Sequence, residues 1–429
     1  MFRRLLKNEY FFSMLNKFSS IFFGVATAAF LNRYLGLEAR GQYAKIMSVV
    51  TVAALILDLG IYQAFPYFKR KYGEEALNKF MALTVLQAIV YFVLAVAGCF
   101  IVKNAAIGLS LFIIPTCVLI QQFGNLVLAT DVVYRSIANI VAMTFCLIAT
   151  FILFLFRNTY QSLFAALFVF FLRSVAFVAL YYVKLPHKIS FKNMDFRFFG
   201  QVLKYSFFPM LTKLLSDINT KVDIWFLTAY KISNAQIGLF SVSLSIIEYM
   251  AYIPGTVNDV LYNHSAKKNT VSEVLTSIKI ISVIIAAVSV VVIIFAKPVL
   301  IILYGKEFED AYNFVLIFLI SRIGDVVFLL IRTLFLADNK RIRLFAVMAG
   351  EFAVNCILNF ALVGSFGAYG SAVATVCSEV IAAVVLMWMF KTEYSIPVKS
   401  LFTFSDYEIQ LFKNKINQLF NKIRKIKTN

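Results

Sequence analysis

The feature that most restricts the fold is a series of long apolar segments that recurs along the 429-residue chain. Residues 278–294 are representative, because they show no alternation of polar and apolar positions. Hydrophobic residues make up 61% of the chain and charged residues 15%, against about 45–50% and about 25% in soluble domains. Such a chain has too few polar side chains to cover a water-soluble surface. It is therefore predicted to be a polytopic membrane protein.

Twelve of these segments are long enough to cross a bilayer. The hydrocarbon core is about 30 Å thick and needs roughly 20 apolar residues in a helix. Outer-membrane strands would instead alternate polar and apolar residues over short segments. We therefore predict an all-α protein with about twelve transmembrane helices. The expected spans are 10–32, 43–65, 80–102, 107–128, 137–156, 163–183, 205–228, 237–262, 275–296, 311–337, 343–363 and 370–390.

The basic residues of the connectors fall mainly on one side of the membrane. When residues 1–9 are placed in the cytoplasm, the cytoplasmic connectors and both tails hold most of them. Because basic loops stay cytoplasmic, both termini are predicted to be cytoplasmic. The net charge of +19 then reflects orientation and contact with anionic lipid, and nucleic acid is not an expected partner. The opposite connectors contain Arg33, Arg40, Lys103, Arg157, Lys231, Lys297 and Lys306.

A long connector near the midpoint predicts two halves. It runs over residues 184–204, so we expect a six-helix bundle at 1–190 and another at 191–395, enclosing a central cavity. Gly41 and Gly238 occupy similar positions before the second and eighth spans, which is the trace of an internal repeat. Residues 396–429 are expected to form a basic cytoplasmic tail with an amphipathic helix.

The residues that enzymes and metal sites commonly use are scarce. The five cysteines lie in apolar segments without C-x-x-C spacing. The two histidines, His187 and His264, lie in polar connectors, so no cluster with metal-ligand spacing is present in the sequence. We expect neither a metal site nor a catalytic residue nor a bound cofactor.

Ionisable residues inside the predicted spans are the candidate functional groups. Each costs at least roughly 2.5–3.5 kcal/mol at the middle of a helix on an insertion scale, so each implies a partner or a hydrated cavity. We predict that five bind the substrate: Lys17, Arg173, Lys213, Arg322 and Arg332. We predict charge pairing or ion coupling for Asp58, Asp217, Lys221, Asp223, Glu248 and Asp325.

The spacing of these residues places several on one helix face. Lys213, Asp217 and Lys221 are four residues apart and can form successive ion pairs, and Arg322 and Asp325 are three apart. Two helices would then present polar faces with an excess of positive charge. Such a cavity favours an anionic passenger, for example a phosphate, a pyrophosphate or an acidic sugar.

Plainer interpretations of the same charges stay open. Paired residues can serve only to hold helices together. Lys221 and Asp223 lie near the outer end of their span, where side chains can extend to the lipid headgroups. Asp58 precedes Gly60 and can be a helix-end residue without a role in coupling.

Several short motifs, in this order along residues 10–390, resemble those of Wzx-like oligosaccharide and polysaccharide flippases of bacteria, in the multidrug/oligosaccharidyl-lipid/polysaccharide (MOP) exporter superfamily. They are RYLG at 33–36, GQY at 41–43, DLG at 58–60, Pro209, Asp223, GLF at 238–240, LYGKEF at 303–308, Asn355 with Asn359, and FGAYGSA at 366–372.

This resemblance implies a MATE-like fold of two bundles. It also implies transport of undecaprenyl-pyrophosphate-linked oligosaccharide across the bacterial cytoplasmic (inner) membrane by alternating access, with coupling to H⁺ or Na⁺ compatible with the family. The implied partners are the lipid-linked substrate, membrane lipids and a polysaccharide polymerase. Two alternatives are a cation-coupled multidrug exporter of the same fold and a membrane sugar polymerase or ligase. The first would favour a pocket lined by carboxylates, and the second would need a long outside loop.

Overall fold

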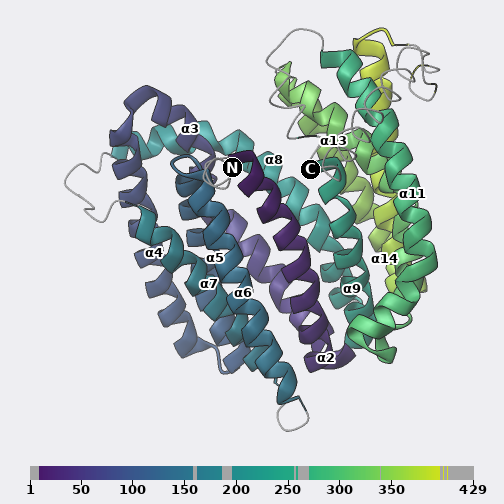
Figure 1. Cartoon of the computed structure of the whole chain (residues 1–429), viewed down its shortest axis with the longest axis horizontal. Coiled ribbons are helices and arrows are strands. Elements are labelled where there is room, and N and C mark those ends of the chain that lie inside the picture. The colour runs from purple at the N-terminus through teal and green to yellow at the C-terminus, as the bar shows by residue number, and fades with distance from the viewer. Residues whose placement is uncertain are drawn as a thin grey trace, which may run out of the picture. The chain divides into compact units, whose positions relative to one another are not determined.

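All regular elements among the described residues are helices, as predicted (Figure 1). The computed structural model describes residues 9–157, 162–185, 196–255, 258, 270–338, 340–396, 400 and 403. The helices are α2 (Glu9–Asp58), α3 (Ile61–Tyr72), α4 (Glu74–Ile101), α5 (Ala105–Leu128), α6 (Val132–Leu155), α7 (Leu163–Lys184), α8 (Phe196–Ala229), α9 (Asn234–Met250), α11 (Thr270–Tyr304), the 3-10 helix η2 (Lys306–Phe308), α12 (Ala311–Leu319), α13 (Arg322–Ala337) and α14 (Arg341–Glu393).

Within the described part of the chain, eight helices are long and apolar enough to cross a membrane, or nine if the bent pair α12–α13 forms one span. Two of them are long enough to hold two predicted spans each. α2 is broken at Gly36 (φ 68°) and α14 at Gly367 (φ 57°), a backbone conformation that is costly for residues with a Cβ. The predicted seventh span lies in α8. The prediction of an all-helical, multi-pass membrane protein is confirmed.

One predicted span ends earlier than the hydropathy suggested. The expected second span, 43–65, stops at Asp58, where Leu59 and Gly60 both take positive φ values and the chain turns into α3. α3 is a short amphipathic helix with a buried apolar face and three basic residues in its last turn. Apolar residues therefore continue past the end of the spanning helix, which is why composition alone placed the boundary too late.

The described residues divide into two compact units. Unit 1 comprises those within Met1–Ser245, Lys297–Val315 and Cys356–Ala372. Unit 2 comprises those within Ile246–Ala296, Leu316–Asn355 and Val373–Asn429. The predicted division near residue 190 stays a prediction. The expected tail at 396–429 lies outside the described residues except for Ile396, Ser400 and Thr403.

In unit 1, the two glycines of the internal repeat meet where α2 crosses α9. A Cβ at Gly41 would lie 1.9 Å from the carbonyl oxygen of Asn234, and a Cβ at Gly238 would lie 2.6 Å from the carbonyl oxygen of Leu37. Lys45 Nζ donates to Asn234 Oδ1 over 2.7 Å at the same crossing. Small residues allow this approach, and in a membrane such packing holds helices together because lipid tails are as apolar as the side chains.

The carboxyl end of α11, also in unit 1, is held by a side chain from α2. Arg33 Nε donates to the carbonyl oxygen of Leu303 over 2.9 Å, and Arg33 Nη2 donates to that of Ile302. These carbonyls lie in the last turn of α11, where intrahelical donors run out. Arg33 precedes the break at Gly36 by three residues, so the same short segment bends α2 and caps α11.

Candidate functional site

α8 carries a charged stripe, defined as Lys213, Asp217 and Lys221. Lys213 Nζ lies 2.6 Å from Asp217 Oδ2, as the four-residue spacing predicts. The side chains of this pair are 42% and 31% exposed, and Lys221 is half-buried one turn further along. α8 belongs to unit 1, where it packs on α2 and α3. The stripe therefore holds a positive charge that the described protein groups do not fully cover.

Asp58 lies in a buried polar network at the end of α2. Gln122 Nε2 of α5 donates to Asp58 Oδ1 over 3.0 Å and to Gln87 Oε1 of α4 over 2.8 Å. Gln87 Nε2 and the Tyr91 hydroxyl, both of α4, donate to the carbonyl oxygen of Leu57. Asp58 is 2% exposed. The interpretation of Asp58 as a simple helix-end residue is thus incomplete, because its carboxyl group accepts from Gln122 of α5, which in turn contacts Gln87 of α4.

Asp223 is enclosed by amide and hydroxyl groups of α14. Asn359 Nδ2 donates to Asp223 Oδ1 over 2.8 Å, and Ser371 Oγ donates to Asn359 Oδ1 over 2.6 Å. Asp223, Asn355 and Asn359 are all fully buried. The interpretation of Asp223 as a side chain that extends to the headgroups is therefore wrong. Its position near the end of an apolar run could not reveal α14, which covers it.

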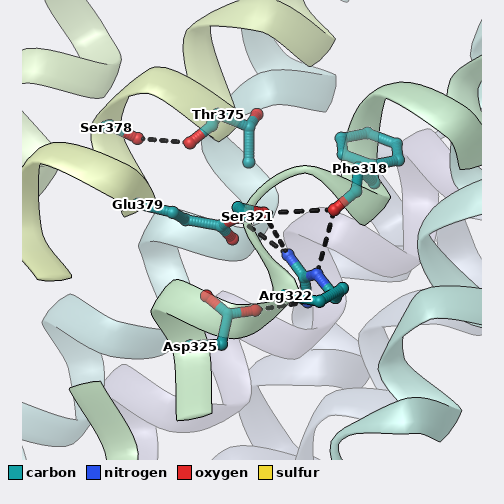
Figure 2. A network of polar contacts seen from close by, with 7 residues as sticks. All are labelled: Phe318, Ser321, Arg322, Asp325, Thr375, Ser378 and Glu379. Carbon is teal, nitrogen blue, oxygen red and sulfur yellow. Dashed lines mark hydrogen bonds and ion pairs between the residues drawn. The ribbon is translucent and has the colours of Figure 1, made fainter. Parts of the chain in front are cut away.

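In unit 2, Arg322 lies between two carboxylates at the break that bends α12 from α13 by 50° (Figure 2). Arg322 Nη1 lies 2.6 Å from Asp325 Oδ2, the pair that the three-residue spacing predicts. Arg322 Nη2 lies 2.8 Å from Glu379 Oε2 of α14. Arg322 Nε donates to the carbonyl oxygen of Phe318 over 3.0 Å, and Ser321 Oγ donates to Glu379 Oε2 over 2.5 Å. The guanidinium thus joins three helices and has two acidic neighbours.

Glu379 was missed as a candidate site residue. It is the lone charged residue in the apolar run 371–390, and that isolation is the signal that could have identified it. Lys279 is a similar case, since it is the lone charge in the predicted span 275–296 and is 7% exposed on α11. An isolated charge in a span implies a partner on another helix, even when no spacing rule names that partner.

The remaining predicted site residues are placed as follows. Lys17 on α2 and Arg173 on α7 are half-buried in unit 1, and Arg332 on α13 is half-buried in unit 2. The Arg173 guanidinium lies 5.3 Å from the centre of the Phe170 ring and 5.4 Å from that of Phe177, within the range of cation–π attraction. Glu248 on α9 is exposed. That these residues share a cavity with the α8 stripe stays a prediction.

Comparison with known proteins identifies the family. A family profile described as "Polysaccharide biosynthesis protein" matches residues 30–313, about two thirds of the chain. The chain belongs to this family. A comparison with curated protein sequences gives no match. The resemblance inferred from the motifs is confirmed at the level of this polysaccharide biosynthesis family.

Solved structures show the same fold at low sequence identity. A lipid II flippase, MurJ, in an inward closed conformation matches with a TM-score of 0.74 and 18% identity, over 91% of this chain and 89% of that one. An inward-facing multidrug resistance MATE family transporter of the MOP superfamily matches with a TM-score of 0.67 and 13% identity, over 88% and 94%. A MOP superfamily transporter from Pyrococcus furiosus matches with a TM-score of 0.57 and 13% identity, over 89% and 93%. The predicted MATE-like fold is confirmed.

Proposed function

We propose that the protein is a flippase that moves undecaprenyl-pyrophosphate-linked oligosaccharide repeat units, such as those of O-antigen, capsule or exopolysaccharide, from the inner to the outer leaflet of the bacterial cytoplasmic membrane. It works by alternating access and is not an enzyme. The observation that carries the proposal is the match of residues 30–313 to a polysaccharide biosynthesis family in a chain with the fold of MOP transporters.

The charges of unit 1 support an anionic headgroup as the passenger. The Lys213 ammonium is partly exposed although it is ion-paired, so an incoming pyrophosphate can compete with Asp217 for it. A pyrophosphate offers several oxygens to Lys and Arg donors, and hydrogen bonds to charged groups contribute about 1.5–3 kcal/mol each. Lys17 and Arg173 are the further cations of unit 1 to which we assign headgroup binding, and Arg322 and Arg332 are those of unit 2.

Orientation, coupling and partners belong to the same proposal. Both termini face the cytoplasm, because the basic connectors and tails fall on that side. Coupling to H⁺ or Na⁺ would use a buried carboxylate, and Asp58 and Asp223 are both at most 2% exposed. A polysaccharide polymerase would take the repeat unit after it reaches the outer leaflet.

The test is genetic and chemical. Deletion of the gene should abolish the surface polysaccharide and cause the lipid-linked repeat unit to accumulate. Lys213→Ala should lower export about tenfold or more, the value of one lost charge-assisted contact. The matched control is Lys297→Ala, since Lys297 is also a lysine paired with one carboxylate, Glu309, over 2.8 Å.

The outcomes separate the candidate functions. Unchanged surface polysaccharide in the deletion strain would refute the flippase proposal. Export by Lys213→Ala at the rate of Lys297→Ala would refute the assignment of Lys213. Resistance to cationic dyes in cells that express the protein, with unchanged polysaccharide, would instead identify a multidrug exporter.

A further inference from the structure

The network around Asp58 contains more hydrogen-bond acceptors than donors. Gln122 Nε2 has two hydrogens but faces three acceptors, which are the carbonyl oxygen and Oδ1 of Asp58 and Oε1 of Gln87. The side-chain donors of Gln87 and Tyr91 are already engaged by Leu57 and by each other. Gln122 Oε1 is buried and accepts from no group of the protein. One more donor is missing from this network.

The partners of the Asp58 carboxylate are the Gln122 amide, the backbone N–H of Gly60 and, electrostatically, Lys213. Gln122 is 1% exposed and Asp58 2%, so bulk water does not reach either side chain. α8 passes beside the end of α2, because a Cβ at Gly60 would lie 2.7 Å from Met210 Cβ. Lys213, about one turn further along α8, acts on Asp58 electrostatically and is itself paired with Asp217 at 2.6 Å. A buried carboxylate with so few partners is costly, and uptake of a proton removes that cost.

We propose that Asp58 is a proton-binding site whose acidic hydrogen supplies the missing donor beside Gln122 Oε1, and that its occupancy strengthens anion binding at Lys213. The proton is taken from water and returned to water, and no other bond changes. When Asp58 is ionised, its negative charge competes with an external anion for the Lys213 ammonium. When Asp58 is neutral, that competition falls to Asp217 alone. The link to anion binding at Lys213 rests on the proposed function, whereas the proton site at Asp58 does not.

A proton fits this site better than a metal cation does. The oxygens of Asp58 and Gln87 would be the ligands, but the Gln122 amide already points its hydrogens at both of them. A sodium ion beside Gln122 Oε1 would gain that oxygen as a ligand, but with the Asp58 carboxylate it would still have fewer oxygens than the roughly six or more that hard cations take. The other titratable groups that act on Asp58 are Tyr62 on α3 and Tyr91 on α4, and both are neutral at physiological pH.

The first experiment reads the proton directly and needs no substrate. Infrared difference spectra of the full chain in lipid nanodiscs are recorded as the pH is raised, in potassium chloride. A carbonyl-stretch band of a protonated carboxyl group should be present in the wild type and lost at high pH. Asp58→Asn should lack the band, and its amide supplies the missing donor, so the variant should fold. Glu75→Gln, which removes an exposed carboxylate paired with Lys79 over 2.8 Å, should retain it.

Three results would overturn the proposal. The first is a band that persists in Asp58→Asn, and the second is a wild type without the band at any pH. The third is loss of the band when sodium replaces potassium at constant pH, which would identify a sodium site. If Asp58→Asn does not fold, Gln122→Leu takes its place. This variant removes the acceptor but keeps the acid, so the band should shift in frequency, and an unshifted band overturns the proposal.

The second experiment measures the link to anion binding, with inorganic pyrophosphate as the probe. The ratio of the affinity of Asp58→Asn to that of the wild type cancels the titration of the probe itself. This ratio should rise with pH by up to tenfold per pH unit, because one proton is linked to binding. A ratio that does not change with pH overturns the linkage. A failure of the deletion test, with the infrared result intact, would overturn the proposed function and leave the proton site standing.

Discussion

The crossing of α2 and α9 gives a sharp prediction about stability, made by adding one methyl group to Gly41. In Gly41→Ala the new Cβ would lie 1.9 Å from the carbonyl oxygen of Asn234, whereas real Cβ contacts stay beyond 3.0 Å. The two helices must therefore separate by about 1.1 Å at this point, because the obstacle is backbone and cannot rotate away. Forced overpacking of this kind costs about 1–3 kcal/mol.

The assay is thermal unfolding of the purified protein in detergent, with Gly350→Ala as the matched control. Gly350 lies within α14, and a Cβ added there would meet no neighbouring atom within 4 Å. Alanine at this position should therefore leave the free energy of unfolding unchanged or raise it by up to about 1 kcal/mol through helix propensity. Gly41→Ala should unfold at a clearly lower temperature than Gly350→Ala. The double variant Gly41→Ala/Gly238→Ala should cost less than the two single effects together, since both methyl groups open the same crossing. Equal unfolding temperatures for Gly41→Ala and Gly350→Ala would refute the reasoning.

Three further predictions concern polar contacts. Asn359→Ala removes a donor from the buried Asp223 and should lower the free energy of unfolding by about 1–3 kcal/mol; chemical denaturation measures this, and Ser371→Ala should cost less. Arg322→Lys should cost about 1–2 kcal/mol in the same assay, because Arg322 contacts Asp325, Glu379 and Phe318 through three different nitrogens and lysine has only one. A wild-type midpoint would contradict this. At the start of α6, Asp131 accepts from the backbone N–H of Tyr134 and pairs with the Lys184 ammonium, and these contacts, in that order, hold its pKa below the ordinary value of an aspartate. The ionised Asp131 therefore stabilises the fold at pH values above its ordinary pKa, and this contribution is lost as the pH falls. Unfolding below about pH 4 should therefore respond more strongly to acid in the wild type than in Asp131→Asn, and parallel curves would count against the assignment.

Contacts along one helix could be predicted from the sequence, and contacts between distant helices could not. The ion pairs of Lys213 with Asp217 and of Arg322 with Asp325 follow from helical spacing, which needs only the helix itself. Glu379 reaches Arg322 across 57 residues, and Asn359 reaches Asp223 across 136, so both contacts depend on how helices pack. Hydropathy therefore gave the helical spans, while the partners of the buried charges came from the structure.

The neighbourhood of Asp58 shows the same limit in another form. The sequence displays an aspartate before a glycine near the end of an apolar run, which is compatible with an ordinary helix end. Its two glutamine neighbours, Gln87 and Gln122, lie on other helices, and no spacing rule along the chain links either of them to position 58. A deficit of donors is a property of the whole network and cannot be assigned to any single residue beforehand.

The attachment of Arg33 to the last turn of α11 has a consequence for which side chains position 33 can accept. Its guanidinium serves two carbonyl groups 270 and 269 residues away with hydrogens fixed in one plane. A lysine could approach the same oxygens, but its single nitrogen holds no such fixed geometry, and glutamine would present a lone pair as often as a hydrogen. In a saturation library scored for folded protein in the membrane, arginine should therefore be strongly favoured over all other residues at position 33.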